Sequence, residues 1–189
     1  MGIGCIAMLD GHSLEMDVVL EQAPPPKLPL NLIVALPRPK ALNRLLAAAT
    51  SLGVARIVLM NAWKVEKSYW KSPRLSEENL FMQRILGLEQ GVDTMLPELQ
   101  LARFFVNFVR DDLPKMAQGT LRLIAHPQAA SACPSDINGP CTLVLGPEGG
   151  FIPDELAALE KIDFMPVRLG ARVLRVETAL AALIGKLYN

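Results

Sequence analysis

Residues 141–156 read CTLVLGPEGGFIPDEL, and this stretch carries most of the information about the fold. Its apolar run, residues 142–145, has the composition of a buried strand and leads into a loop with three glycines. Pro153 suits the first position of a helix, and Asp154 and Glu155 place carboxylates in the first turn, where the helix dipole favours them. The pattern predicts a strand, a glycine turn and a helix, an arrangement that lets backbone N–H groups approach a ligand closely.

The chain upstream alternates short apolar runs with segments of helical periodicity. Strands are predicted over residues 30–36, 54–60, 121–125 and 142–145, and helices over residues 40–52 and 76–89. Gly53 is placed to end the first helix, and Ser76 to cap the start of the second. Apolar strands that alternate with helices form parallel sheets, so we expect an α/β fold with helices on both faces of a parallel sheet. A last helix, residues 177–188, is apolar on more than one face and is expected to be buried on several sides.

The N-terminal segment reads differently. Residues 1–23 form two β-prone runs around Asp10-Gly11, which predicts a hairpin, and the proline-rich residues 24–29 predict a stiff linker. We therefore divide the chain into a segment of residues 1–26 and a main domain of residues 27–189. The segment GIGCIA, residues 2–7, matches a dinucleotide-binding pattern only formally, because no strand precedes it and no helix follows.

A second glycine turn, LGARVLRVETAL over residues 169–180, follows the first and leads into the last helix. Two such loops close together in sequence predict one site. The first loop fits neither the dinucleotide fingerprint nor the phosphate-binding P-loop. The alternative is that its glycines serve only the geometry of a tight turn.

Bulk properties exclude several classes of protein. Formal net charge is zero, which argues against RNA binding by overall charge, although a local patch would suffice. Cys5, Cys133 and Cys141 lie far apart, which argues against a disulfide scaffold or a zinc site and favours a cytoplasmic location. No apolar run reaches the length of a membrane helix, and no export signal is evident.

Residues 63–74, WKVEKSYWKSPR, form the best local patch. Their basic side chains suit phosphates and their aromatic rings suit unpaired bases. The candidate RNA contacts are Lys64, Lys67, Lys71 and Arg74. The alternative is a solvated loop whose tryptophans fold back onto the domain.

The two glycine loops together resemble the 16S ribosomal RNA (uracil-N3)-methyltransferases, within the SPOUT superfamily of knotted methyltransferases. The resemblance rests on residues 145–151 and 169–179, and more weakly on LGVARIV at residues 52–58 and on residues 87–98; it covers about residues 28–189. It implies a parallel α/β sheet with a C-terminal trefoil knot and a homodimer that packs across the last helix. It also implies that the hairpin is a remnant of an N-terminal PUA-like β domain.

The resemblance further implies S-adenosylmethionine as the cofactor and no metal, because the methyl group leaves a neutral sulfide behind. The implied cofactor residues are His126, Leu145, Gly146, Pro147, Glu148, Gly149, Gly150, Leu169, Gly170, Val173, Leu174, Arg175, Glu177, Thr178 and Ala179. For His126, turn chemistry before Pro127 is the alternative. The implied substrate is N3 of a uridine in the small ribosomal subunit.

Methylation at N3 requires an anionic base. Arg172 and Arg175 are the predicted stabilisers of that anion, and Glu177 is predicted to accept a proton or to hold an arginine. The alternative for these three residues is a mutual salt-bridge network. Gln90 is a further candidate RNA contact, but the arginine that the family places shortly after it is missing here. Two other functions stay open: methylation of another ribosomal or transfer RNA site, and a non-catalytic RNA-binding or assembly factor.

Overall fold

The structure is a computed structural model that describes residues 2–188. Its main domain is built on a seven-stranded sheet with strand order β5-β4-β3-β8-β6-β9-β7, and every neighbouring pair in it is parallel. The strands are β3 (Leu28–Ala35), β4 (Val54–Met60), β5 (Glu98–Ala102), β6 (Leu121–Ala125), β7 (Ser131–Ala132), β8 (Cys141–Leu145) and β9 (Met165–Arg168). The four strands predicted from apolar runs are confirmed.

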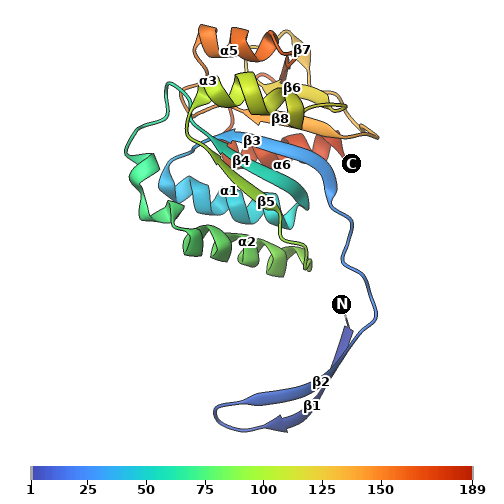
Figure 1. Cartoon of the computed structure of the whole chain (residues 1–189). Helices are drawn as coiled ribbons and strands as arrows, with labels where there is room; N and C mark the ends of the chain where they lie inside the picture. Colours follow the sequence, from blue (N-terminus) through green and yellow to red (C-terminus); the bar gives the residue numbers. More distant parts are fainter. Residues whose placement is uncertain (1, 189) are drawn as a thin grey trace.

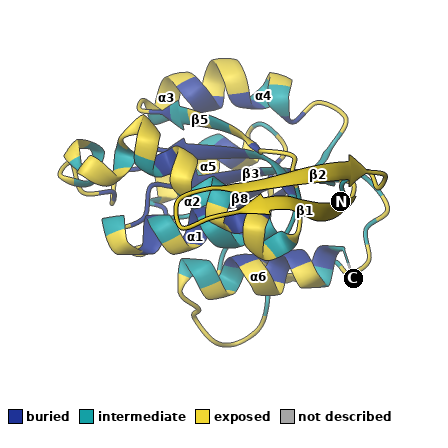
Figure 2. Cartoon of the chain, turned by 90° about the horizontal axis from the view of Figure 1, so that it is seen from below, coloured by how far each residue is buried: buried dark blue, intermediate teal, exposed yellow. Residues whose placement is uncertain are grey.

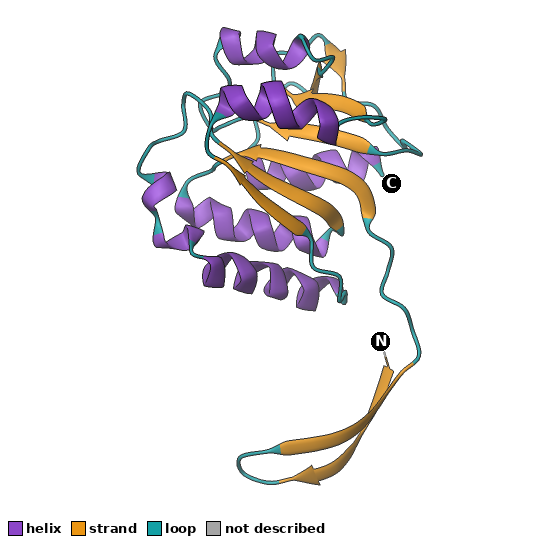
Figure 3. Cartoon of the chain, viewed as in Figure 1, coloured by secondary structure: helices purple, strands orange, loops and turns teal. Residues whose placement is uncertain are grey.

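Helices cover both faces of this sheet, as predicted (Figures 1 and 3). One face carries α1 (Pro39–Ser51) and α6 (Val176–Leu187), with α2 (Glu77–Gly91) packed against α1. The other face carries α5 (Pro153–Glu160) and a continuous stretch of α3 (Phe105–Asn107), the π-helical turn η3 (Phe108–Asp112) and α4 (Leu113–Met116). Two short 3-10 turns, η1 (Tyr69–Lys71) and η2 (Pro73–Leu75), lead into α2.

The core lies around the central strands, where helices cover both faces of the sheet. All five residues of β8 are buried, and β3 beside it is buried from Leu32 to Ala35. The polar residue of β8, Thr142, is satisfied by Asn31 Nδ2 at 3.2 Å and by the Thr120 hydroxyl at 2.9 Å. Continuous apolar runs therefore mark the central strands because both of their faces pack against helices.

Both predicted helix ends are confirmed. Gly53 follows α1 with a φ of +78°, a left-handed conformation that glycine adopts without strain, and its N–H donates to Thr50 O at 3.0 Å. The Ser76 hydroxyl accepts a hydrogen bond from the backbone N–H of Asn79 at the start of α2.

The expectation for the last helix was wrong for the single chain. One face of α6 is buried through Leu180, Leu183, Ile184 and Leu187, but the opposite face is exposed. That exposed face carries the small residues Thr178, Ala181, Ala182 and Gly185. The sequence misled because alanine and glycine count as apolar but tolerate exposure readily.

The predicted hairpin is confirmed as the antiparallel pair β1 (Gly2–Leu9) and β2 (Leu14–Leu20). The carboxylate of Asp10 closes its turn by accepting the N–H groups of His12 and Ser13, both at 2.7 Å. Every residue of both strands is exposed (Figure 2), and the hairpin stands away from the main domain (Figure 1). The segment GIGCIA lies in β1 and not in a strand–turn–helix unit. Among residues 2–188 no helix combines the length and the apolar character needed to cross a membrane.

Candidate functional site

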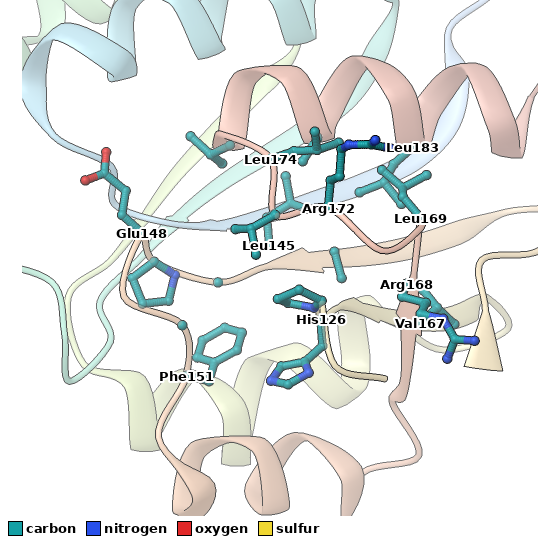
Figure 4. A pocket seen from close by; sticks show the side chains of 18 of the residues that line it. His126, Leu145, Glu148, Phe151, Val167, Arg168, Leu169, Arg172, Leu174 and Leu183 are labelled. Carbon is teal, nitrogen blue, oxygen red and sulfur yellow. The ribbon is translucent and has the colours of Figure 1, made fainter. Parts of the chain in front are cut away.

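A cavity of about 150 Å³ lies at the carboxyl ends of β6, β8 and β9. In parallel α/β sheets, ligands bind at this edge because the loops that follow the strands converge there. The two glycine loops predicted to form one site both line it (Figure 4). The predicted residues on its walls are His126, Leu145, Gly146, Pro147, Glu148, Gly150, Leu169, Gly170, Arg172, Val173, Leu174 and Ala179.

The other predicted site residues lie outside the cavity walls. Gly149 lines a neighbouring hollow, whereas Arg175, Glu177 and Thr178 stand at the start of α6. The carboxylate of Glu177 forms an ion pair with Arg44 on α1, at 2.7 Å. Glu177 is therefore part of a salt bridge, although its structural partner comes from α1 and not from the arginines of its own loop.

This ion pair sets the charge state of Glu177. Partial burial raises the pKa of its carboxyl, but hydrogen bonds from Arg44 and from its own backbone N–H, with the positive charges of Arg44 and Arg175, outweigh burial. The net pKa lies below its ordinary value, so the carboxylate is ionised at neutral pH.

The glycine loop between β8 and α5 leaves room for a ligand. Gly150 has a φ of +72°, and its N–H closes the turn on Pro147 O at 2.8 Å. A Cβ atom built at Gly150 or at Gly170 would meet no atom within 4 Å. Both glycines line the cavity and border open space that a side chain would enter.

A buried carboxylate fixes the helix that follows this loop. The N-cap residue of α5 is Ile152, which has no capping hydroxyl; instead, Glu155 accepts the Ile152 N–H at 3.1 Å. The other oxygen of Glu155 accepts the backbone N–H of Trp63 at 2.7 Å. Glu155 therefore ties the glycine loop to the segment after β4, a contact that the sequence did not predict.

Several cavity residues were missed by the sequence analysis. Phe151 and Val167 face the cavity opposite Leu174 and Leu183 (Figure 4). Val167 belongs to β9, whose Pro166 obscured the strand pattern. Phe151 was within the quoted motif, and its ring contributes to the mainly apolar wall.

A polar hollow of about 130 Å³ adjoins the cavity across the glycine loop. There Arg38 forms a two-pronged ion pair with Glu148, whose closest contact is 2.6 Å. The ammonium group of Lys64 donates to the Gly149 carbonyl at 2.7 Å. Glu66 and Tyr69 complete the ionisable lining.

The stretch of residues 63–74 agrees in part with each of its two interpretations, an RNA contact and a loop whose tryptophans fold back onto the domain. Trp63 is 78% exposed, as a stacking platform requires. Trp70 instead folds back: its indole N–H donates to Asn61 Oδ1 at 2.8 Å, and Arg103 stacks over its ring at 5.0 Å. The predicted basic contacts Lys64, Lys67, Lys71 and Arg74 are all exposed, and so is Gln90 at the end of α2.

Metal ligands do not gather in the described part of the chain: residues 2–188 contain no cluster of three or more His, Cys, Asp or Glu side chains suited to a metal ion. Cys133 and Cys141 are buried free thiols, and burial raises the pKa of both, that of Cys141 to about 12.

A parallel sheet with a mainly apolar, glycine-bordered cavity at its carboxyl edge defines a ligand-binding α/β domain. The chain belongs to the RNA methyltransferase domain family, which it matches over residues 24–188.

Relatives agree with this assignment. The chain is 29% identical over 161 residues to ribosomal RNA small subunit methyltransferase E of Treponema pallidum, covering 82% of this chain and 59% of the relative. It thus spans less than two thirds of that curated relative. The structure of the Neisseria gonorrhoeae ribosomal RNA small subunit methyltransferase E, bound to S-adenosyl methionine, is similar with a TM-score of 0.74 at 24% identity, over 96% of this chain and 75% of that one. A Legionella pneumophila protein in complex with the bound cofactor SAM has a TM-score of 0.71 at 25% identity, over 97% and 75% of the two chains.

Proposed function

We propose that this protein is an S-adenosylmethionine-dependent methyltransferase that modifies RNA of the small ribosomal subunit. The observation that carries the proposal is the cavity between the loops LGPEGGF and LGARVL at the carboxyl edge of the sheet. The family of the chain, the names of its relatives and the cofactor in two similar structures support it. This function would place the protein in the cytoplasm.

The walls of the cavity fit the cofactor. Leu145, Leu169, Leu174 and Val173 would contact its apolar parts, while the open space beside Gly150 and Gly170 would admit it to the backbone. When bound, the cofactor supplies a methyl group on a sulfonium sulfur, and the sulfur leaves as a neutral thioether. The protein has to orient the target atom and stabilise its anionic form.

The finer target that we propose is N3 of a uridine in 16S ribosomal RNA. Arg172 lines the cavity, and its role in stabilising the anionic base stays a prediction. Roles for Arg175 in charge stabilisation and for Glu177 in proton transfer stay predictions, as do cofactor contacts by Gly149, Arg175, Glu177 and Thr178.

For RNA contact we propose the exposed Trp63 together with Lys67, Lys71 and Arg74, a surface beside the polar hollow that Lys64 lines. Gln90 lies at the end of α2 and stays a candidate. Replacing Lys67 and Arg74 with glutamine should weaken RNA binding and reduce its salt dependence by about one phosphate contact per residue.

Three larger features complete the proposal. The exposed small residues of α6 would permit close packing against a second copy, which supports a homodimer. The C-terminal chain would form a trefoil knot, as the resemblance implies. The hairpin would belong to a PUA-like β domain, which its exposed apolar side chains and its lack of a third strand among the described residues support.

The test is calorimetric titration of the purified chain with S-adenosylmethionine, with ATP and NAD as controls. We expect saturable binding of S-adenosylmethionine alone, followed by methyl transfer to unmodified small-subunit ribosomal RNA. Transfer only to transfer RNA would favour another target. Tight cofactor binding without any transfer would favour a non-catalytic RNA-binding factor, and a folded sample that binds no cofactor would refute the proposal.

A further inference from the structure

The polar hollow beside the cavity has a volume of about 130 Å³. It lies between the β3–α1 turn, the segment after β4 and the glycine loop. Pro147 and Glu148 line both spaces, so Glu148 is the one ionisable residue of the described chain that borders the hollow and the cavity together.

Glu148 is held in a defined position at this border. Arg38 Nε lies 2.6 Å and 2.9 Å from its two carboxylate oxygens, and a terminal guanidinium nitrogen lies 2.6 Å from Oε2. Figure 4 shows the carboxylate at the edge of the cavity, directed away from its interior. A two-pronged arginine contact fixes orientation as well as charge.

The hollow has the chemistry to recognise a uracil ring. The imide edge of uracil carries an N3–H donor between two carbonyl acceptors. The hollow supplies a carboxylate acceptor in Glu148 and cationic donors in Arg38 and Lys64. Cytosine, which carries no hydrogen on N3, lacks the donor that a carboxylate would bind.

We propose that the hollow binds the target uracil and that Glu148 accepts its N3 proton. This inference rests on the proposed function and adds to it the residue that deprotonates the base. Glu66 lines the hollow but not the cavity, and Glu177 lines neither space. Of these three glutamates, Glu148 alone borders the space where the methyl donor would lie.

The proposed step balances. A carboxylate oxygen of Glu148 takes the proton, and the electron pair of the N3–H bond stays on nitrogen, where it forms the new bond to the methyl carbon as the sulfonium C–S bond breaks onto sulfur. Glu148 then returns the proton to water. Negative charge passes from the carboxylate to the ring beside the same Arg38 guanidinium, so the arginine is not left without a counter-charge.

The central experiment compares Glu148→Gln with Glu160→Gln, using an unmodified small-subunit ribosomal RNA transcript; Glu160 is exposed on α5 and lines neither space. We expect Glu148→Gln to lower the single-turnover rate by about 10²- to 10⁴-fold, the usual value of a general base. Glu160→Gln should leave the rate unchanged. Calorimetric affinity for S-adenosylmethionine should be preserved in both variants.

Two further readouts separate proton transfer from a structural role. Without cofactor, wild type should bind the uridine transcript more tightly than its N3-methyluridine counterpart, and Glu148→Gln should lose that preference. A transcript with 5-fluorouridine, whose N3 is more acidic, should restore part of the lost rate. The residual rate of Glu148→Gln should also rise with pH. The other ionisable residues of the hollow are the same in both variants: Arg38, Lys64, Glu66 and Tyr69.

The outcomes are distinguishable. If wild type transfers no methyl group, the proposed function fails and this inference fails with it. If wild type is active and Glu148→Gln retains its rate, or loses it without rescue by 5-fluorouridine, the inference alone is overturned.

Discussion

Glu155 Oε1 on α5 and the backbone nitrogen of Trp63 lie 2.7 Å apart. This contact joins the helix that follows β8 to the segment that follows β4, the strand next but one to β8 in the sheet. Glu155→Ala would leave the N–H groups of Trp63 and Ile152 without their acceptor. We expect a loss of about 1–3 kcal/mol in the free energy of unfolding, measured by urea denaturation.

The matched control is Asp154→Ala, which removes an exposed carboxylate from the same helical turn. It should cost only about 0.3–1 kcal/mol, through the helix dipole. Equal losses in the two variants would contradict a special role for the buried contact.

Gly87 lets α2 approach α1 closely. A Cβ atom there would lie 2.5 Å from Ala47 O and 2.6 Å from Thr50 Cβ, which is too near for backbone to tolerate. Gly87→Ala should therefore destabilise the protein by about 1–3 kcal/mol, despite the better helix propensity of alanine. Gly139→Ala is the control, because a Cβ there meets nothing within 4 Å; it should be neutral or slightly stabilising. Thermal melts of both variants measure the difference.

Ala179 forms part of the cavity wall from α6. Ala179→Phe would fill space that the cofactor needs, so affinity for S-adenosylmethionine should fall at least about tenfold, or about 1.4 kcal/mol. Ala157→Phe, at an exposed position of α5, should leave the calorimetric affinity unchanged. Unchanged binding by Ala179→Phe would place the cofactor elsewhere.

The Lys27–Asp93 ion pair anchors the end of the linker beside α2, at 2.6 Å. Burial raises the pKa of Asp93, but hydrogen bonds from Lys27 and from the N–H groups of Met95 and Thr94 outweigh burial, and the net pKa lies below the ordinary 3.8. Because the folded pKa is depressed, the pair stabilises the fold above the ordinary pKa and this stabilisation is lost as pH falls through the folded value.

Asp93→Asn keeps an oxygen for the turn but removes the charge. The difference in unfolding free energy between wild type and this variant should be about 1.5–3 kcal/mol at neutral pH. It should shrink on acidification below the ordinary pKa of 3.8. A difference that does not change between neutral and strongly acidic pH would contradict this account.

The sequence predicted those elements whose packing is uniform along their length. Strand β8 is buried at every residue, so its apolar run was unambiguous. The edge strand β5 alternates exposed and covered residues, and β9 contains Pro166, so neither carried that signal. The turn residues Gly53 and Ser76 were predictable because their roles depend on local backbone geometry.

The candidate site divided in the same way. Its glycine loops were predictable from composition, since strand, turn and helix are local. The pairing of Arg44 with Glu177 joins residues 133 positions apart, and the Trp63–Glu155 contact joins residues 92 apart. Contacts between residues so far apart depend on tertiary packing, and a local pattern in one sequence does not predict them.

The order of strands also governs when the site can exist during synthesis. The central neighbours β3 and β8 pair residues such as Asn31 and Thr142, which are 111 positions apart. Every wall of the cavity comes from Ala125 onward, and its last wall residue is Leu183 in α6. During synthesis, β3 therefore lacks its neighbour β8 until residues 141–145 have been made. A cofactor that binds in the cavity cannot stabilise the fold until the wall residues, up to Leu183, are present.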